Sequence, residues 1–372
     1  MAREKTTVTR REVIKGAGYA AAAALLGPAT APAQECVKPL GVALIGAAHI
    51  HTPQYVNALK GRAGLNVKSA WDHDAERAAK YAGELGCKVA TNLDAIWRDP
   101  EIVGVVICSE TDRHKDLVAA TAAAKKHMFV EKPLAATAKE SFSMAAAIEK
   151  AGVLFTTGYF MRTAPEHLFL KEQVAKGSFG KITRVRGSNC HNGSLGGWFD
   201  TDYRWMADPK IAGVGAFGDL GTHSLDIMMW LLGGIESATA DIQIVTGRYP
   251  GCDETGEALL KFQNGVIGTL AAGWVDVDNP VSLLISGTEG HAAIIKGQLY
   301  FKSSKVPNAD GKDPWKALPS AGIPPIQQFF DALEGKPHPN LVKPAEAAAR
   351  VAVMEAAYQG ARTQTWVKVA QK

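Results

Sequence analysis

Short apolar runs alternate with amphipathic, alanine-rich segments from residue 40 onward. Some of these runs predict strands, at residues 40–46, 65–71, 88–90, 102–108, 128–130 and 153–158. The segments between them predict helices, at residues 53–61, 75–85, 115–126 and 139–150. Apolar strands separated by helices of about ten to fifteen residues are typical of a parallel sheet that helices cover on both faces. The pattern therefore predicts a doubly wound α/β domain.

The pattern changes after about residue 160, where strand-like runs follow one another across short turns, at residues 182–189, 238–246, 257–262, 266–275, 281–286 and 292–296. Turn sequences such as Gln263-Asn264-Gly265 indicate antiparallel pairing. Helices are expected at 209–232 and 344–362. We therefore predict an α+β domain with an open, mainly antiparallel sheet. The predicted domains are residues 34–158 and 159–372, after a leader of residues 1–33.

The leader has features of its own. Arg10-Arg11 precedes a weakly apolar stretch at 16–26, and Ala31-Pro32-Ala33 fits a small-x-small cleavage site. The apolar stretch is shorter than the roughly 20 residues that a membrane-spanning helix needs. This order predicts a twin-arginine export signal, with a frayed basic N-terminus before an alanine-rich helix as the alternative. Such a signal implies passage through the twin-arginine machinery, in folded form, to the periplasm.

Charge and composition narrow the classes of partner. The formal net charge is +4, of which the first fifteen residues contribute +3 through five cations and two anions. The remainder is close to neutral, so we expect no nucleic-acid or anionic-membrane partner. A chain that is 47% hydrophobic and 21% charged has the composition of a globular protein. Its five cysteines form no C-x-x-C pair, and we expect mostly buried thiols and no disulfide scaffold.

The first predicted strand runs into Gly46-Ala47-Ala48-His49-Ile50-His51. A dinucleotide-binding fold has G-x-G-x-x-G at this point, with the pyrophosphate at the start of the helix. Gly46 fits the first position, whereas Ala48 and His51 replace the other two glycines. Asp72 ends the second strand, where a carboxylate can accept hydrogen bonds from an adenosine ribose. The pair predicts a dinucleotide crevice; a plain strand–helix turn and a helix cap are the alternatives.

His49 and His51 also allow a metal site, because two histidines at i and i+2 near a helix start can share an ion. The sequence places no third ligand beside them, so no metal site is predicted. We prefer a histidine that reaches the pyrophosphate or the substrate.

Polar residues also follow two later strands of the same sheet. After residues 102–108 come Ser109, Glu110, Thr111 and His114. Ligands of open α/β sheets bind beyond the carboxyl ends of the strands, so this loop should line the same crevice. Glu131-Lys132-Pro133 follows the next strand. A lysine at this place can stabilise charge that develops on a substrate oxygen, and a solvated surface lysine is the alternative.

Asp219 and His223 are spaced i, i+4, so on a helix they share one face. A carboxylate beside an imidazole raises the basicity of the ring and orients it, as a general acid/base requires. The alternative is a capping aspartate and a core histidine.

Phe129-Val130-Glu131-Lys132-Pro133, followed downstream by Asp219-Leu220-Gly221-Thr222-His223, resembles the Gfo/Idh/MocA oxidoreductase family. The resemblance implies a Rossmann domain and an NAD(P)-dependent enzyme that transfers a hydride to or from a hydroxyl carbon of a sugar, cyclitol or related polyol. It implies that Lys132, Asp219 and His223 are catalytic. The cofactor contacts that we expect are Gly46, Ala48, His49, Ile50, Asp72, Ser109, Glu110, Thr111, His114, Glu131 and Lys132.

Glu110 stands where members of that family usually have proline, and Asp72 is followed by His73 and Asp74 rather than arginine. Both features favour NAD over NADP. Residues between the lysine and the Asp/His pair are candidate substrate contacts: Tyr159, Arg162, His191, Arg204 and Trp205. Two other functions stay open, a glycosidase or lyase that oxidises its substrate transiently, and an exported carbohydrate-binding module without cofactor.

Apolar residues in the second sheet would need a partner if they lay on its uncovered face. The candidates are Leu259, Val266, Ile267 and Leu270. We therefore expect a homo-oligomer formed through that sheet.

Overall fold

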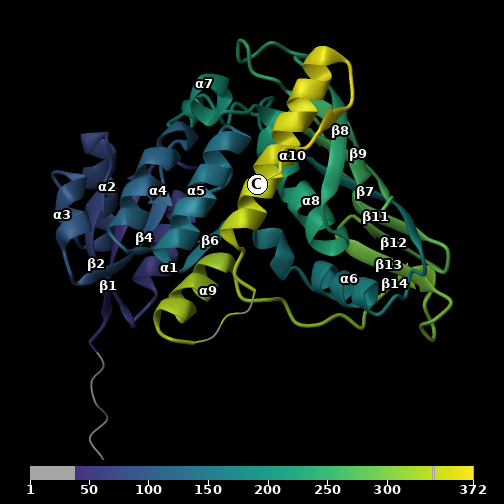
Figure 1. The fold of residues 1–372 in the computed structure, drawn as a ribbon, viewed down its shortest axis with the longest axis horizontal. Helices are drawn as coiled ribbons and strands as arrows, with labels where there is room; N and C mark the ends of the chain where they lie inside the picture. The colour runs from purple at the N-terminus through teal and green to yellow at the C-terminus, as the bar shows by residue number, and fades with distance from the viewer. Residues whose placement is uncertain (1–37, 337, 339, 372) are drawn as a thin grey trace, which may run out of the picture. The chain divides into compact units, whose positions relative to one another are not determined.

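Parallel strands form the first sheet of the computed structural model (Figure 1). Their order in the sheet is β3-β2-β1-β4-β5-β6. The structure describes residues 38–336, 338 and 340–371, so the predicted export signal lies outside the described residues. The strands are β1 (Leu40–Ala47), β2 (Leu65–Trp71), β3 (Lys88–Val89), β4 (Ile102–Cys108), β5 (His127–Val130) and β6 (Phe155–Thr157). The strand order reverses between β1 and β4, and ligands of such sheets bind beyond this point.

Helices cover both faces of this sheet: α1 (Thr52–Lys60), α2 (Ala75–Leu85), α3 (Leu93–Arg98), α4 (His114–Ala123) and α5 (Ala138–Ala151). Separate apolar clusters fill the two sides, one around Ile107 and Met144, the other around Val106 and Tyr55. Asp74 caps the start of α2 by accepting a hydrogen bond from the Arg77 amide. The predicted doubly wound domain is confirmed.

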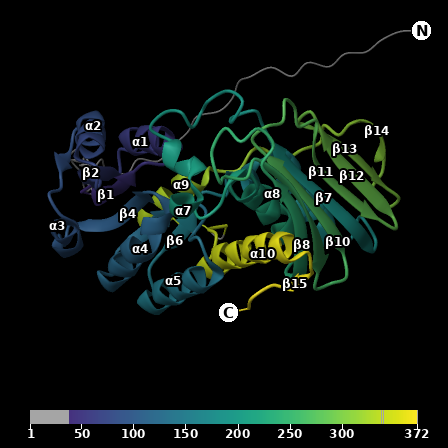
Figure 2. The same cartoon turned by 90° about the horizontal axis from the view of Figure 1, so that it is seen from above.

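The second sheet has the order β14-β13-β12-β11-β7-β10-β9-β8-β15. Its strands are β7 (Ile182–Cys190), β8 (Ile235–Gln243), β9 (Thr255–Phe262), β10 (Ile267–Gly273), β11 (Val281–Gly287), β12 (Gly290–Ile295), β13 (Gln298–Ser303), β14 (Asp310–Pro314) and β15 (Val367–Lys368). Strands β7 and β10 pair in parallel, and the other pairings are antiparallel. Helix α8 (Ala216–Leu232) packs on β7, β9 and β10, so one face is covered (Figure 2). The predicted mainly antiparallel sheet is confirmed.

The prediction of one continuous helix at residues 209–232 is wrong, because the structure has two helices there. A short helix α7 (Pro209–Ala212) ends before α8 begins. Gly213 between them has a φ of 79°, and a Cβ there would lie 2.5 Å from the Cβ of Ala136. The left-handed backbone and the close approach both require glycine. The break turns the first turn of α8 toward the end of β5.

Two later helices return to the first domain. Helix α9 (Pro325–Leu333) places Phe329 and Phe330 in the apolar cluster beside α1. Helix α10 (Pro344–Thr363) packs against both α5 and β8, and thus joins the two sheets (Figure 2). None of the helices among the described residues combines the length and hydropathy needed to cross a membrane. The four cysteines of the described chain are free, and Cys36 lies outside it.

Only two of the four apolar residues that we considered for the open face of the second sheet are exposed there. Leu259 and Ile267 are exposed, to 38% and 57%, as expected. The placement of Val266 and Leu270 on that face is wrong, because both side chains are buried. Leu270 lies three residues after Ile267 on a strand, and side chains of a strand alternate between its faces. It therefore points toward α8.

Candidate active site

Lys132 and Asp219 join the two domains at the centre of the site. Lys132 follows β5, and its Nζ lies 2.6 Å from Oδ1 of Asp219 in the first turn of α8. The Trp274 Nε1 donates to the other carboxylate oxygen at 3.3 Å. Burial alone would raise the pKa of Asp219, but the Lys132 ammonium lowers it to about 2. The buried pair is therefore an ammonium held by an ionised carboxylate.

His223 lies one turn after Asp219 and is buried between Phe160 and Tyr159, with ring centroids 4.9 Å and 6.3 Å away. Burial, and next the charge of Lys132, hold the pKa of His223 well below its usual value. The ring is therefore neutral, and its Nδ1 has no hydrogen-bond partner among the described residues. The predicted Asp219–His223 pairing is wrong, because the carboxylate binds Lys132 instead. A neutral imidazole with an unused nitrogen can accept a proton.

Glu131 is fully buried beside Lys132. The Tyr55 hydroxyl and, at 2.7 Å, the Lys132 amide donate to its carboxylate. Nδ1 of His51 lies 3.0 Å from one oxygen, and Nε2 of His49 lies 3.7 Å from the other. Burial alone would raise the pKa of Glu131, but the neighbouring imidazoles and Lys132 lower it well below its usual value. Burial lowers the pKa of His49 to about 3.

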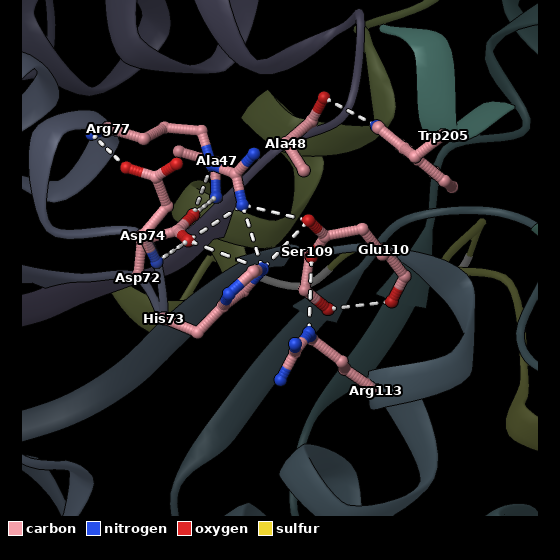
Figure 3. A network of polar contacts seen from close by, with 10 residues as sticks. All are labelled: Ala47, Ala48, Asp72, His73, Asp74, Arg77, Ser109, Glu110, Arg113 and Trp205. Atoms are coloured by element: carbon pink, nitrogen blue, oxygen red, sulfur yellow. Dashed lines mark hydrogen bonds and ion pairs between the residues drawn. The ribbon is translucent and has the colours of Figure 1, made fainter. Parts of the chain in front are cut away.

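The turn after β1 has the tight geometry of a nucleotide-binding turn. Gly46 has a φ of 71°, and a Cβ there would lie 2.5 Å from the Cβ of Ser109. Only glycine fits that approach. The Trp205 indole, from the second domain, donates a hydrogen bond to the Ala48 carbonyl at 3.0 Å (Figure 3). The turn is therefore in direct contact with the second domain.

The carboxylate of Asp72 is occupied by the protein itself (Figure 3). It accepts from the amides of Ala47 and Asp74, at 2.7 Å and 2.9 Å, and from two nitrogens of Arg77, both at 2.8 Å. Arg77 also donates to Glu110 at 2.8 Å. No motif in the sequence indicated Arg77, which reaches Asp72 because it lies just over one turn further along, in α2.

The cavity beside Lys132 and Asp219 is small. His49, Thr111, Lys132, Trp205, Met206 and Asp219 are among the residues that line a cavity of about 10 Å³. That is room for about one water molecule.

A larger cavity of about 520 Å³ lies beside this cleft. Its lining comes from the loop after Pro133, the start of α8 and helix α10, and includes Asp253, Glu355 and Tyr358. The Tyr358 hydroxyl donates to Asp253 at 2.9 Å. Lys132 and His223 are not among its lining residues.

Several predicted site residues have structural partners instead. Arg162 was expected to contact substrate, but both its Nε and Nη2 donate to Asp226 in a buried ion pair, which Arg350 shares. His114 is buried with its Nδ1 3.2 Å from the carbonyls of Pro133 and Leu134. It therefore holds the loop after Lys132 in place.

Of the remaining candidate substrate contacts, Arg204 is exposed and lies over the ring of Tyr249. Tyr159 is buried and its hydroxyl is 3.1 Å from that of Thr222, so it supports α8. His191 is half-buried against Trp198, close enough to Asp219 and Lys132 to feel their charges. Trp205 and His191 are therefore the candidates that the fold brings near Lys132.

Domain models of one family match most of the chain. The one described as an oxidoreductase family with an NAD-binding Rossmann fold matches residues 40–159, and the GFO/IDH/MocA C-terminal domain matches residues 167–293. The chain belongs to the Gfo/Idh/MocA family of oxidoreductases. The resemblance stated from the E-K-P and D-x-G-x-H motifs is thereby confirmed, and the first domain is an NAD-binding Rossmann domain.

Curated relatives of this Gfo/Idh/MocA chain include two enzymes of anhydrosugars. It is 26% identical to 1,5-anhydro-D-fructose reductase of Ensifer adhaerens, over 80% of this chain and 89% of that enzyme. It is 28% identical to levoglucosan dehydrogenase of Pseudarthrobacter phenanthrenivorans, over 58% of this chain and 61% of that enzyme. The second match therefore spans only about three-fifths of the relative.

Solved structures share the fold over most of the chain. An enzyme of gentamicin A biosynthesis, solved with NAD, is 25% identical with a TM-score of 0.73, over 90% of this chain and 97% of that one. Levoglucosan dehydrogenase in complex with NADH and levoglucosan is 24% identical with a TM-score of 0.75, over 90% and 100%. The second likeness concerns the fold alone.

Proposed function

We propose that this chain catalyses the reversible NAD-dependent oxidation of a CH–OH group in a sugar, cyclitol or related polyol, with anhydrosugars as the first candidates. The observation that carries the proposal is the meeting of Lys132, Asp219 and His223, from β5 and α8, at the edge of an NAD-binding Rossmann sheet. The names of the relatives supply the substrate class, since they act on 1,5-anhydro-D-fructose, levoglucosan and inositols.

The residues of the first domain fit the cofactor. Gly46 provides the tight turn, and Thr111 and Lys132 line the cleft beside it. Asp72 follows β2, at the place where a ribose is held, and would have to exchange a hydrogen bond from Arg77 for one from the ribose. The nicotinamide, when bound, takes a hydride from the substrate carbon or returns it. The paired carboxylates of Asp72 and Glu110 around Arg77 favour NAD, because a 2′-phosphate would meet their negative charge.

The chain's own residues handle the proton and the oxygen. In the oxidation direction the ring of His223 accepts the hydroxyl proton, since burial keeps that ring neutral. Lys132 Nζ donates a hydrogen bond to the same oxygen and stabilises its negative charge. Asp219 holds the Lys132 ammonium in position. In the reverse direction the protonated His223 returns the proton.

The test is a substrate panel with the purified chain and NAD⁺. Levoglucosan, 1,5-anhydroglucitol, inositols and free hexoses are supplied in turn, and NADH is followed by absorbance. We expect NADH formation with at least one of them. Tight NAD binding without turnover of any polyol would redirect the substrate class, and absence of NAD binding would overturn the proposal.

A second reaction type is favoured by one relative. The chain is 28% identical to 2,7-anhydro-N-acetylneuraminate hydratase of Escherichia coli, over 62% of this chain and 61% of that enzyme. A substrate oxidised transiently would give a rearranged product and no net NADH. Product analysis by mass spectrometry in the same panel separates the two reactions.

We also propose that the chain is exported to the periplasm and forms a homo-oligomer. Arg10-Arg11, the weakly apolar stretch and the small-x-small site support a twin-arginine signal and a periplasmic location. The exposed Leu259 and Ile267 support a homo-oligomer through the open face of the second sheet. Cell fractionation of the full chain and of a variant with Arg10 and Arg11 replaced by lysine tests the export route.

A further inference from the structure

Three metal-ligating side chains meet beside Lys132. His49 and His51 come from the turn between β1 and α1, and Glu131 comes from the end of β5, 80 residues after His51. Their ligand atoms all lie within 4.8 Å of one another. The sequence offered two histidines without a third ligand, and the fold supplies that ligand.

The spacing suits one ion. Nitrogen and carboxylate ligands lie about 2.0–2.2 Å from Zn²⁺, so two ligands of a tetrahedral ion are about 3.4 Å apart. The distances from Glu131 to His51 and to His49 are 3.0 Å and 3.7 Å, on either side of that value. Small movements of the two rings therefore bring all three atoms to coordination distance.

The buried negative charge of Glu131 also favours a bound cation at this cluster. Glu131 is fully buried, and among the described residues no lysine or arginine forms an ion pair with it. The nearest ammonium, that of Lys132, is bound to Asp219. A buried carboxylate is stable when it is paired or coordinates a metal. The imidazoles of His49 and His51 beside it complete a set that borderline divalent ions prefer.

Outer partners of the set are already in place. The Tyr55 hydroxyl and the Lys132 amide donate to the Glu131 carboxylate, which orients its oxygens. One internal bond opposes metal binding, because the His51 amide donates to Nδ1 of His49 at 3.2 Å. Nε2 of His49 becomes a ligand when its proton moves to Nδ1, which ends this bond. The bond is at the long end of the normal range, so the cost of losing it is small.

We propose that His49, His51 and Glu131 bind one divalent transition-metal ion, with Zn²⁺ as the first candidate. Three protein ligands leave a fourth position for water or a substrate oxygen, as in catalytic zinc sites. His49 also lines the small cavity that Lys132 and Asp219 line. An ion held by His49 is therefore close enough to polarise the oxygen that Lys132 binds, an activity beyond the proposed hydride transfer.

The test measures metal binding without cofactor or substrate. The chelator-treated chain is titrated with Zn²⁺ by calorimetry, and with Co²⁺, whose visible absorption reports tetrahedral nitrogen and oxygen ligands. We expect about one ion per chain. Since the loss of an outer partner alone costs roughly 10–100-fold in affinity, His51→Ala should weaken binding at least that much. His291→Ala, at an exposed position on β12, is the control and should leave binding unchanged.

Glu131→Gln is the second variant, because it keeps the shape of the buried side chain while it removes the charge. Circular dichroism checks that each variant is folded. If Glu131→Gln does not fold, the test rests on His51→Ala, because His51 is part-exposed and its replacement disturbs the core less. No binding to the wild-type chain overturns the proposal. Binding that His51→Ala leaves intact places the ion elsewhere and overturns it as well. Neither result depends on NADH formation, so the metal proposal and the proposed oxidoreductase function are tested independently of each other.

Discussion

Asp219 is the residue on which the arrangement of the site depends. It holds Lys132 and accepts from Trp274, and it lies one turn before His223. The sequence indicated the three residues through their motifs, but it assigned the carboxylate to the wrong partner. On a helix, spacing of i, i+4 brings two side chains to one face without requiring contact. A buried ammonium attracts the carboxylate more strongly than a neutral ring does.

Asp219→Asn should therefore destabilise the fold as well as reduce turnover. Removing one partner of a buried ion pair costs about 3–5 kcal/mol. Asp94→Asn breaks the pair with Arg98, whose two side chains are 68% and 83% exposed, and should cost less than about 1 kcal/mol. Denaturant unfolding of both variants makes the comparison. Equal losses would mean that Lys132 does not need this partner.

Because of its buried histidines, the protein should lose stability at pH values well above the pKa of carboxylates. Burial lowers the pKa of His49 to about 3 and that of His223 well below its usual value. The unfolded chain takes up these protons below about pH 6.5 and the folded chain does not, so stability falls as the pH drops. Each histidine should cost about 2 kcal/mol at pH 5.

The depressed carboxylates Glu131 and Asp219 contribute stability that is lost only below about pH 4.5. The range between pH 4.5 and 6.5 therefore reports the histidines. Urea unfolding at pH 7 and pH 5 measures the effect, and His223→Asn should reduce the difference between the two. A protein equally stable at both values would contradict the buried, neutral rings.

At the scale of elements, helix α2 presents Arg77 to the crevice, where Asp72 and Glu110 neutralise it. Glu110→Gln removes one of these charges, so a 2′-phosphate beside Arg77 meets less negative charge, while Arg77 stays bound to Asp72. The affinity for NADPH should rise about tenfold, equivalent to about 1.4 kcal/mol, while that for NADH changes little. Quenching of tryptophan fluorescence measures both. Glu76→Gln, at an exposed place in the same helix, is the control. An unchanged preference would mean that Arg77 does not face the ribose.

Most elements followed from periodicity, and the exceptions have physical causes. Strands β2 and β4 and helix α2 have the predicted bounds, since their apolar runs are long and end at clear turns. Helix α9 was missed because Pro324-Pro325 hid its start. The break at Gly213 depends on Ala136, some 77 residues away, which no local pattern reports. Contacts between distant loops, such as Arg77 with Glu110 or Glu131 with His51, were likewise invisible before folding.

For the whole molecule, the uncovered face of the second sheet predicts self-association. Ile267 is 57% exposed at the start of β10, between Lys261 and Arg184 on the neighbouring strands, with Leu259 two residues before Lys261 on the same face. Ile267→Lys should dissociate an oligomer that forms there, because the added ammonium must be desolvated beside the cations of Lys261 and Arg184. Light scattering after size-exclusion chromatography gives the mass. Lys181→Ala, beyond the start of β7, is the control. A mass unaffected by Ile267→Lys would place the interface elsewhere.

In the proposed reaction Lys132 and His223 act on a substrate oxygen beside a bound nicotinamide. The most direct measurement compares NADH binding with turnover in Lys132→Ala and His223→Ala, using whichever polyol the panel identifies. General acid/base catalysis contributes about 10²–10⁴ in rate, so both variants should lose at least that much turnover. NADH affinity should change far less, at least in His223→Ala. Variants that turn over at near wild-type rates would contradict the account.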